Sequence, residues 1–88
     1  MITEHASTRA TQRGIPRKIV ETIFMFGAEQ PAPGRTVRIS LDRASILLAA
    51  EDNPRLQSKL ERYRDAYLVV GAGGRVITVA RRRRCVFH

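Results

Sequence analysis

The chain has few of the residues that usually cross-link a small protein or carry it into a membrane. It is 88 residues long, with one cysteine, Cys85, and no tryptophan. A single cysteine excludes an intramolecular disulfide framework and a zinc site built on paired cysteines, and it is typical of a reducing compartment. No apolar run approaches the roughly 18 residues of a transmembrane helix, and no secretory signal opens the sequence. We therefore expect a cytoplasmic protein without a membrane span.

Acidic residues and lysines are also scarce. The chain has 16 basic against 8 acidic residues, which gives a formal net charge of +8 at pH 7. Only Lys18 and Lys59 are lysines, and the other basic residues are arginines. The planar arginine group binds phosphate oxygens through paired hydrogen bonds, although a genome rich in G and C also raises the arginine count. The charge predicts a salt-dependent attraction to an anionic partner such as nucleic acid.

Length and composition limit the chain to one small domain. A chain of this size buries roughly 60 to 65% of its unfolded surface, which suffices for one modest core and excludes a two-domain enzyme. Its hydrophobic residues, 43% of the total, recur at ordered spacings, so intrinsic disorder is not expected. We expect one basic domain over residues 1–88, with residues 82–88 as a frayed tail or a short edge strand.

Apolar spacing predicts two helices at the start of the chain. The first covers residues 3–12, with Thr3 as its cap and Gly14 as its end. The second begins at Pro16, carries apolar residues at three- and four-residue spacing, and stops at Gly27.

The rest of the chain alternates between strand and helix patterns. Residues 27–34 contain two prolines and are expected to form a surface loop. Beyond this loop we expect a strand, two helices and a hairpin of two strands: residues 35–41, 41–48, 54–64, 67–70 and 75–81. Residues 41–48 also fit a buried strand, but their alanines and a cap at Ser40 or Asp42 favour the helix.

These elements predict an α+β domain with the order ααβααββ. Two N-terminal helices pack on a small antiparallel sheet of three or four strands, and one or two helices are inserted between the strands. The glycine-rich turn at 71–74 joins two strands and leads into no helix, so it does not predict a nucleotide phosphate site. Asp42, Glu51 and Asp52 lie near a helix end with no histidine close in sequence, so we expect neither a metal nor another cofactor.

One cluster of residues suggests chemistry on a phosphate. His5, Arg9 and Arg13 follow one another at four-residue spacing, which places them along one face of a helix. A neutral imidazole beside fixed positive charge is what a general base acting on a phosphodiester requires. The other interpretation is a solvated helix face near the end of the chain.

The same residues carry a resemblance to a known family. Residues 5–15 contain His-x-x-x-Arg-x-x-x-Arg-Gly-Ile, and residues 74–81 contain Ile-Thr-Val followed closely by an arginine. This pattern, over residues 5–82, resembles a widespread bacterial family of short domains of unknown function. That family is thought to be distantly related to the barnase and RelE-like ribonuclease toxins, in which two N-terminal helices pack on an antiparallel sheet. The aromatic residue expected after Ile-Thr-Val is Ala80 here.

The resemblance implies RNA cleavage without a metal. His5 would act as base or acid, and Arg9 with Arg81 would hold the phosphate. Thr78 would donate a hydrogen bond to a phosphate oxygen from the last strand. Such a site requires His5 and Arg81 to face each other across one pocket.

Further contacts to nucleic acid are expected from other arginines: Arg13, Arg38, Arg82, Arg83 and Arg84. Alternation would send two side chains of the run 81–84 to each face, so the strand must leave the core there. Tyr67 and Phe87 are the two candidate platforms for base stacking, because three aromatic residues are assigned to the core: Phe24, Phe26 and Tyr63. An extended single-strand-binding sheet is therefore not predicted.

Two functions follow from these patterns. The first is a toxin-like domain that binds RNA or cleaves it, with an acidic antidote protein as a second partner. The alternative is a non-catalytic module that holds nucleic acid or an acidic protein, as a monomer or as a homodimer through the edge of its hairpin.

Overall fold

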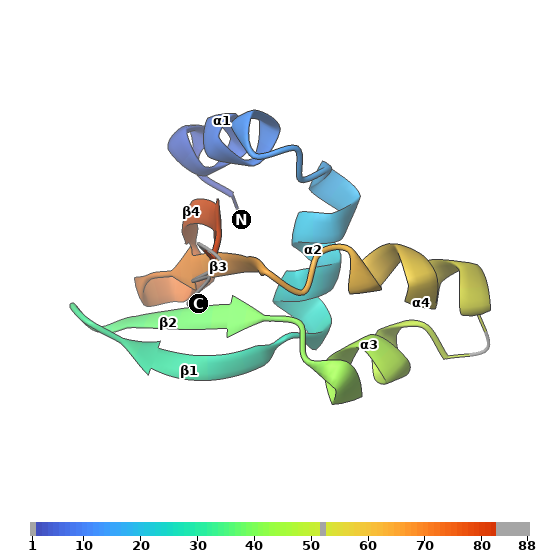
Figure 1. Cartoon of the computed structure of the whole chain (residues 1–88). Helices are drawn as coiled ribbons and strands as arrows, with labels where there is room; N and C mark the ends of the chain where they lie inside the picture. The colour runs from blue at the N-terminus through green and yellow to red at the C-terminus, as the bar shows by residue number, and fades with distance from the viewer. Residues whose placement is uncertain (1, 52, 83–88) are drawn as a thin grey trace, which may run out of the picture.

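The computed structural model describes residues 2–51 and 53–82, which form an α+β domain (Figure 1). The elements, in chain order, are α1 (Glu4–Gln12), α2 (Arg17–Phe26), β1 (Ala28–Ala32), β2 (Thr36–Ser40), α3 (Arg43–Ala49), α4 (Pro54–Glu61), β3 (Ala66–Val70), the short 3-10 turn η1 (Ala72–Gly74) and β4 (Val76–Arg81). The predicted fold class is confirmed, with two N-terminal helices, a four-stranded sheet within the described residues, and two inserted helices.

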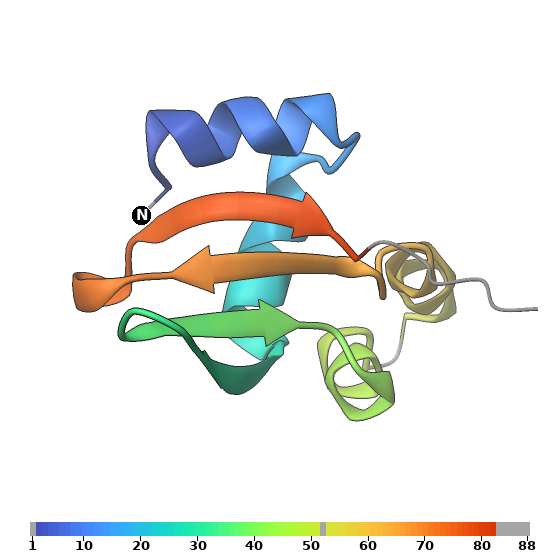
Figure 2. The ribbon, with the colours of Figure 1, turned by 60° about the vertical axis from the view of Figure 1, so that its left-hand side comes forward.

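The sheet is antiparallel throughout, with the strand order β1-β2-β3-β4. Helix α2 packs against β2 and β3 on one side of the sheet, and α1 runs beside β4. Figure 2 shows α2 passing behind the strands, α1 next to β4, and α3 with α4 at one end of the sheet. In the part of the chain that the structure describes, no helix crosses the other side of the sheet (Figure 2).

Residues 27–34 do not form the expected loop. Residues Ala28–Ala32 form β1, which pairs with β2 and sets Pro31 opposite Val37. The loop prediction is wrong because two prolines exclude a helix but not an edge strand, which tolerates a residue without an N–H. The other predicted helices and strands are present, with ends that differ by a few residues.

Helix α1 is bounded by local signals that were visible in the sequence. The Thr3 side chain accepts a hydrogen bond from the Ala6 N–H, as expected of its cap. Gly14 has a φ of +68°, and the Ile15 N–H donates to the Ala10 carbonyl, which together make the usual glycine-ended helix terminus. The buried Ile15 then turns the chain toward α2.

Two alanines let α1 lie close to β4. Ala6 and Ala10 are buried one turn apart on the same helix face. At the start of both elements, the Thr3 N–H donates to the Val76 carbonyl. Because α1 accompanies β4, the outer edge of the hairpin is not open, and the free edge of the sheet among the described strands is β1. A homodimer through the hairpin edge would have to displace α1.

The core lies between α2 and the sheet, and a bulge in β4 completes it. Val76 and Val79 are both buried although they are three residues apart, a spacing that points to opposite faces in a regular strand. The register shifts between Val69 and Val70 because Ile77 is left out of the pairing. Phe24 was expected in the core and is instead 38% exposed at its rim.

Asp42 caps α3 and supports a pH-dependent contribution to stability. Its carboxylate accepts hydrogen bonds from the Ser45 hydroxyl (2.5 Å) and from the Ser45 N–H (2.8 Å). These bonds, the hydroxyl bond first, lower the pKa of Asp42 from its ordinary value of 3.8. A carboxylate with a lowered folded-state pKa stabilises the fold above the pKa of the unfolded chain, and this stabilisation is lost as the pH falls.

We expect Asp42→Asn to remove this pH dependence and to keep the cap, because asparagine retains a side-chain oxygen acceptor. The free energy of unfolding of the wild type should fall more than that of the variant between about pH 5 and about pH 3. Urea denaturation at both pH values measures the difference, and the other carboxylates cancel in the comparison. An identical pH dependence in the two proteins would contradict the assignment.

Candidate functional site

The side of the sheet opposite α2 carries several of the predicted site residues and, among the described residues, is not covered by a helix (Figure 2). We call it the open face and define it by the side chains that the strand register turns away from α2: Ala28, Gln30, Ala32, Thr36, Arg38, Ser40, Tyr67, Val69, Thr78 and Ala80. No carboxylate lies among these residues, so the positive charge of Arg38 is not neutralised within the open face.

Two rows of side chains cross the sheet on the open face. The first row is Gln30, Arg38, Val69 and Thr78. The second row is Ala28, Ser40, Tyr67 and Ala80. In the second row, both residues beside Tyr67, Ser40 and Ala80, are small.

Arg38 lies over the ring of Tyr67. Its guanidinium carbon is 4.7 Å from the ring centroid, and the two residues are diagonal neighbours on β2 and β3. The stacking is worth about 0.5–1 kcal/mol at a partly exposed site. Arg38 Nε is buried and has no hydrogen-bond partner among the described residues, which costs about 1–3 kcal/mol. The Nε donor of this guanidinium therefore lacks an acceptor among residues 2–51 and 53–82.

A second guanidinium reaches the open face from beyond the end of β4. Arg82 Nη2 donates to Ser40 Oγ at 3.4 Å, and the Arg82 N–H donates to the Asp65 carbonyl at 2.6 Å. Ser40 pairs with Tyr67 across the strands. Arg38 thus lies over the ring of Tyr67, and Arg82 is hydrogen-bonded to Ser40, the residue opposite Tyr67 on β2.

Three of the predicted site residues meet on this face. Arg38 and Arg82, predicted to contact nucleic acid, share it with Thr78, which the resemblance placed in a catalytic site. Thr78 lies two strands from Arg38 in the same row, a separation of about 10 Å. An oligonucleotide backbone can contact both side chains at once.

Arg81 points to the other side of the sheet and is used within the fold. Its Nε donates to the Arg13 carbonyl at 3.0 Å, and its Nη1 donates to Asp65 Oδ1 at 2.7 Å and to the Arg62 carbonyl at 3.5 Å. Its guanidinium also stacks over Tyr63, with 5.2 Å from its carbon to the ring centroid. Arg81 thus joins the ends of α1 and α4 to the start of β3. Its side chain makes three hydrogen bonds within the protein, to Arg13, Arg62 and Asp65.

The pocket that the resemblance implies between His5 and Arg81 is not formed. Helix α1 and β4 run in the same direction, so α1 starts beside the start of β4 and ends where Arg81 contacts Arg13. His5 is exposed in the first turn, about 12 Å of helix rise from Arg13. Arg9 Nη1 donates a hydrogen bond to Gln12 Oε1 at 3.2 Å. His5 therefore lies at the end of α1 that is far from Arg81, and of the three residues of the stripe Arg13 contacts Arg81, through its backbone carbonyl.

Several predicted features lie outside the described residues. These are Arg83, Arg84, Phe87 and, apart from Arg82, the terminal segment 82–88. Among residues 2–51 and 53–82, no three His, Cys, Asp or Glu side chains gather closely enough to hold a metal ion. The helices in these ranges are too short or too polar to cross a bilayer.

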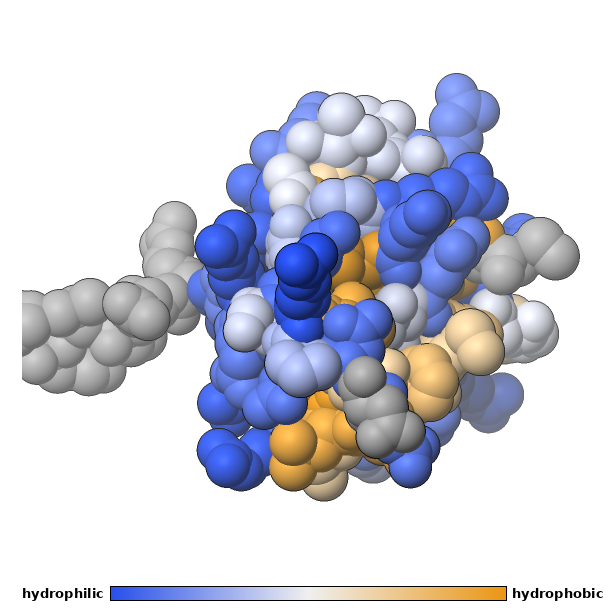
Figure 3. All heavy atoms as spheres, turned by 90° about the vertical axis from the view of Figure 1, so that its right-hand side faces the viewer, coloured by the Kyte–Doolittle hydropathy of each residue, from blue (hydrophilic) through white to orange (hydrophobic). Residues whose placement is uncertain are grey.

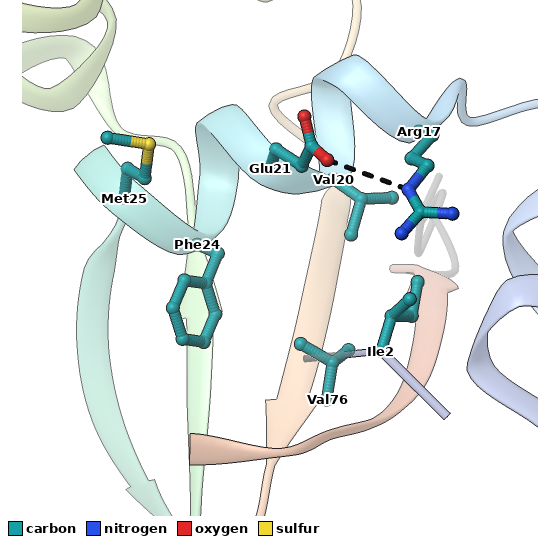
Figure 4. A pocket seen from close by; sticks show the side chains of 7 residues that line it. All are labelled: Ile2, Arg17, Val20, Glu21, Phe24, Met25 and Val76. Carbon is teal, nitrogen blue, oxygen red and sulfur yellow. Dashed lines mark ion pairs between the residues drawn. The ribbon is translucent and has the colours of Figure 1, made fainter. Parts of the chain in front are cut away.

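A cavity of about 430 Å³ lies on the α2 side of the molecule, away from the open face. Figure 4 shows its lining residues: Ile2, Arg17, Val20, Glu21, Phe24, Met25 and Val76. Its walls are mostly apolar, and the charged pair at its edge, Arg17 with Glu21, is joined at 3.5 Å. None of the predicted site residues lines it.

Apolar side chains also reach the surface at the end of the molecule formed by α3 and α4. Leu47 and Leu48 of α3 are exposed, and Figure 3, which looks onto this end, shows apolar surface surrounded by hydrophilic side chains. At this end the arginine that stacks on an aromatic ring, Arg81 over Tyr63, is already hydrogen-bonded within the fold.

Comparison of the chain with protein-family models, with curated proteins and with solved structures found no match. The resemblance to the ribonuclease-like family stays a prediction.

Proposed function

We propose that the protein binds RNA through the open face and does not cleave it. The observation that carries the proposal is the arrangement of Arg38 over Tyr67, with Arg82 on the neighbouring Ser40, on a face without a carboxylate. Guanidinium groups bind phosphate oxygens, and an aromatic ring beside them stacks with a base. RNA supplies both groups in one ligand. The proposal places the protein in the cytoplasm.

Charge supports an RNA partner over a neutral one. The chain carries a formal net charge of +8, which raises the local concentration of any polyanion and speeds its encounter with the protein. An acidic protein would use the charge but would leave the half-buried ring of Tyr67 unused. The combination of charge and an aromatic ring favours nucleic acid.

The positions of His5 and Arg81 argue against catalysis at this face. Arg81 makes hydrogen bonds within the fold, and His5 lies at the far end of α1. A metal-free ribonuclease requires a base and a phosphate clamp within hydrogen-bond reach of one phosphodiester. Thr78, the remaining residue of the implied site, lies on the opposite side of the sheet from Arg81.

The proposal predicts that Arg38→Ala weakens RNA binding about tenfold, whereas Lys18→Ala changes it less than about twofold. Both substitutions remove one positive charge. Lys18 is exposed on α2, behind the sheet, so its loss changes the net charge without touching the open face. Fluorescence anisotropy with a labelled RNA of mixed sequence measures both affinities.

Three outcomes would contradict the proposal. Equal losses in the two variants would mean that net charge alone attracts RNA. Competition by polyglutamate as effective as that by unlabelled RNA would indicate an acidic protein partner. Fragments with cyclic phosphate ends, after incubation with total RNA in EDTA, would show cleavage.

A further inference from the structure

We infer that the open face takes single-stranded RNA and that one unpaired base stacks on Tyr67, an inference that rests on the proposed function. The base replaces the Arg38 guanidinium over the ring. Arg38 then turns to a phosphate of the same strand, and Arg82 holds a second phosphate near Ser40.

The surroundings of Tyr67 leave room for a base. Its neighbours across the strands are Ser40 and Ala80, and neither side chain rises to the height of the ring. The side chain over the ring is Arg38, which is long and flexible and whose Nε makes no hydrogen bond to another described residue. A base that displaces it meets an aromatic surface with small residues on both sides.

The unpartnered Nε of Arg38 explains why the exchange is favourable. In the free protein this donor is buried without an acceptor among the described residues. A phosphate accepts from Nε and from a terminal nitrogen of the same guanidinium at once. The base takes the place of Arg38 over the Tyr67 ring, so the ring remains covered. The Nε of Arg38 gains a hydrogen-bond acceptor.

The single ring selects the form of the nucleic acid. In a duplex the flat faces of the bases are stacked on one another, so a side chain on a flat sheet cannot reach them. Tyr67 is the one aromatic residue among the described side chains of the open face. The face therefore accepts one unpaired base and tolerates any base identity, since every base presents a π-face.

Tyrosine fluorescence gives a direct readout of this stacking. The protein has no tryptophan, and Tyr63 and Tyr67 are its two tyrosines. In a Tyr63→Phe background the emission reports Tyr67 alone, and phenylalanine preserves the ring beneath Arg81. Titration with a non-self-complementary RNA of about ten nucleotides should quench this emission, whereas its blunt duplex should not.

Affinity measurements on two variants complete the test. We expect Tyr67→Ala to weaken single-strand binding about tenfold and to leave duplex binding unchanged. Tyr67→Phe should bind the single strand nearly as well as the wild type, because it keeps the ring. This second variant also guards against a folding defect in the first.

The outcomes separate this inference from the proposed function. Unquenched emission at saturation, or equal affinity of the wild type for single strand and duplex, would overturn base stacking while RNA binding stands. Loss of single-strand affinity in Tyr67→Phe as large as in Tyr67→Ala would overturn it as well. Absence of binding to either RNA would overturn the proposed function itself.

Discussion

RNA binding by the wild-type protein is expected to weaken about sevenfold when the salt concentration rises from about 50 to about 200 mM. Each phosphate neutralised on a single strand releases counterions and contributes about −0.7 to the slope of log affinity against log salt. Contact with two phosphates, those at Arg38 and Arg82, gives a slope of about −1.4, and a fourfold rise in salt then produces the stated loss.

The slope also identifies which arginines contact the backbone. Arg38 turns to a phosphate in the bound state, so Arg38→Ala should reduce the magnitude of the slope by about 0.7. Lys18, behind the sheet, should leave the slope unchanged when it is replaced by alanine. Anisotropy titrations over a series of salt concentrations measure both slopes. A wild-type affinity that does not vary with salt would refute the electrostatic part of the proposal.

Local signals in the sequence predicted most of the helices. Thr3 and Gly14 bound α1 through hydrogen bonds to residues three to five positions away, which depend on nothing distant in the chain. Asp42 bounds α3 in the same way. Elements specified by such short-range contacts can be read from the residues themselves.

The strand β1 depends on a partner and was therefore missed. Its sequence contains Pro31 and has no alternation of buried and exposed residues. It forms because β2 offers a free edge and the turn at Gly34, with a φ of +75°, reverses the chain between them. The propensity of the segment taken alone favours a loop, and the pairing overrides it.

The arrangement of the site was partly open to prediction. Thr78 and Arg81 are three residues apart, so alternation within a strand already indicates opposite faces. The distance between His5 and Arg81 depends on the direction in which α1 runs along β4, and no local pattern encodes that direction. The stacking of Arg38 on Tyr67 depends on the register between β2 and β3, which two separate segments set together.

We expect Gly27→Ala to lower the free energy of unfolding by about 3 kcal/mol. A Cβ at Gly27 would lie 2.5 Å from the Ile23 carbonyl oxygen, 2.5 Å from Ile39 Cγ2 and 3.0 Å from the Ser40 carbonyl oxygen. The Ile23 carbonyl accepts the Gly27 N–H at 2.7 Å, at the end of α2, and cannot move without breaking this bond. The methyl group would therefore separate α2 from β2, the strand that carries Arg38.

Gly71→Ala is the matched control, because it adds the same methyl group at another glycine outside the helices and strands. The φ of Gly71 is −97°, and the nearest atoms to an added Cβ belong to the Ile77 side chain at 3.8 Å. Its unfolding free energy should stay within about 0.5 kcal/mol of the wild type. Urea denaturation of the three proteins measures both effects. If the two variants lose equal unfolding free energy, the close packing of α2 on β2 is not the cause of the loss at Gly27. The loss would then come from the backbone freedom that any glycine has and alanine lacks.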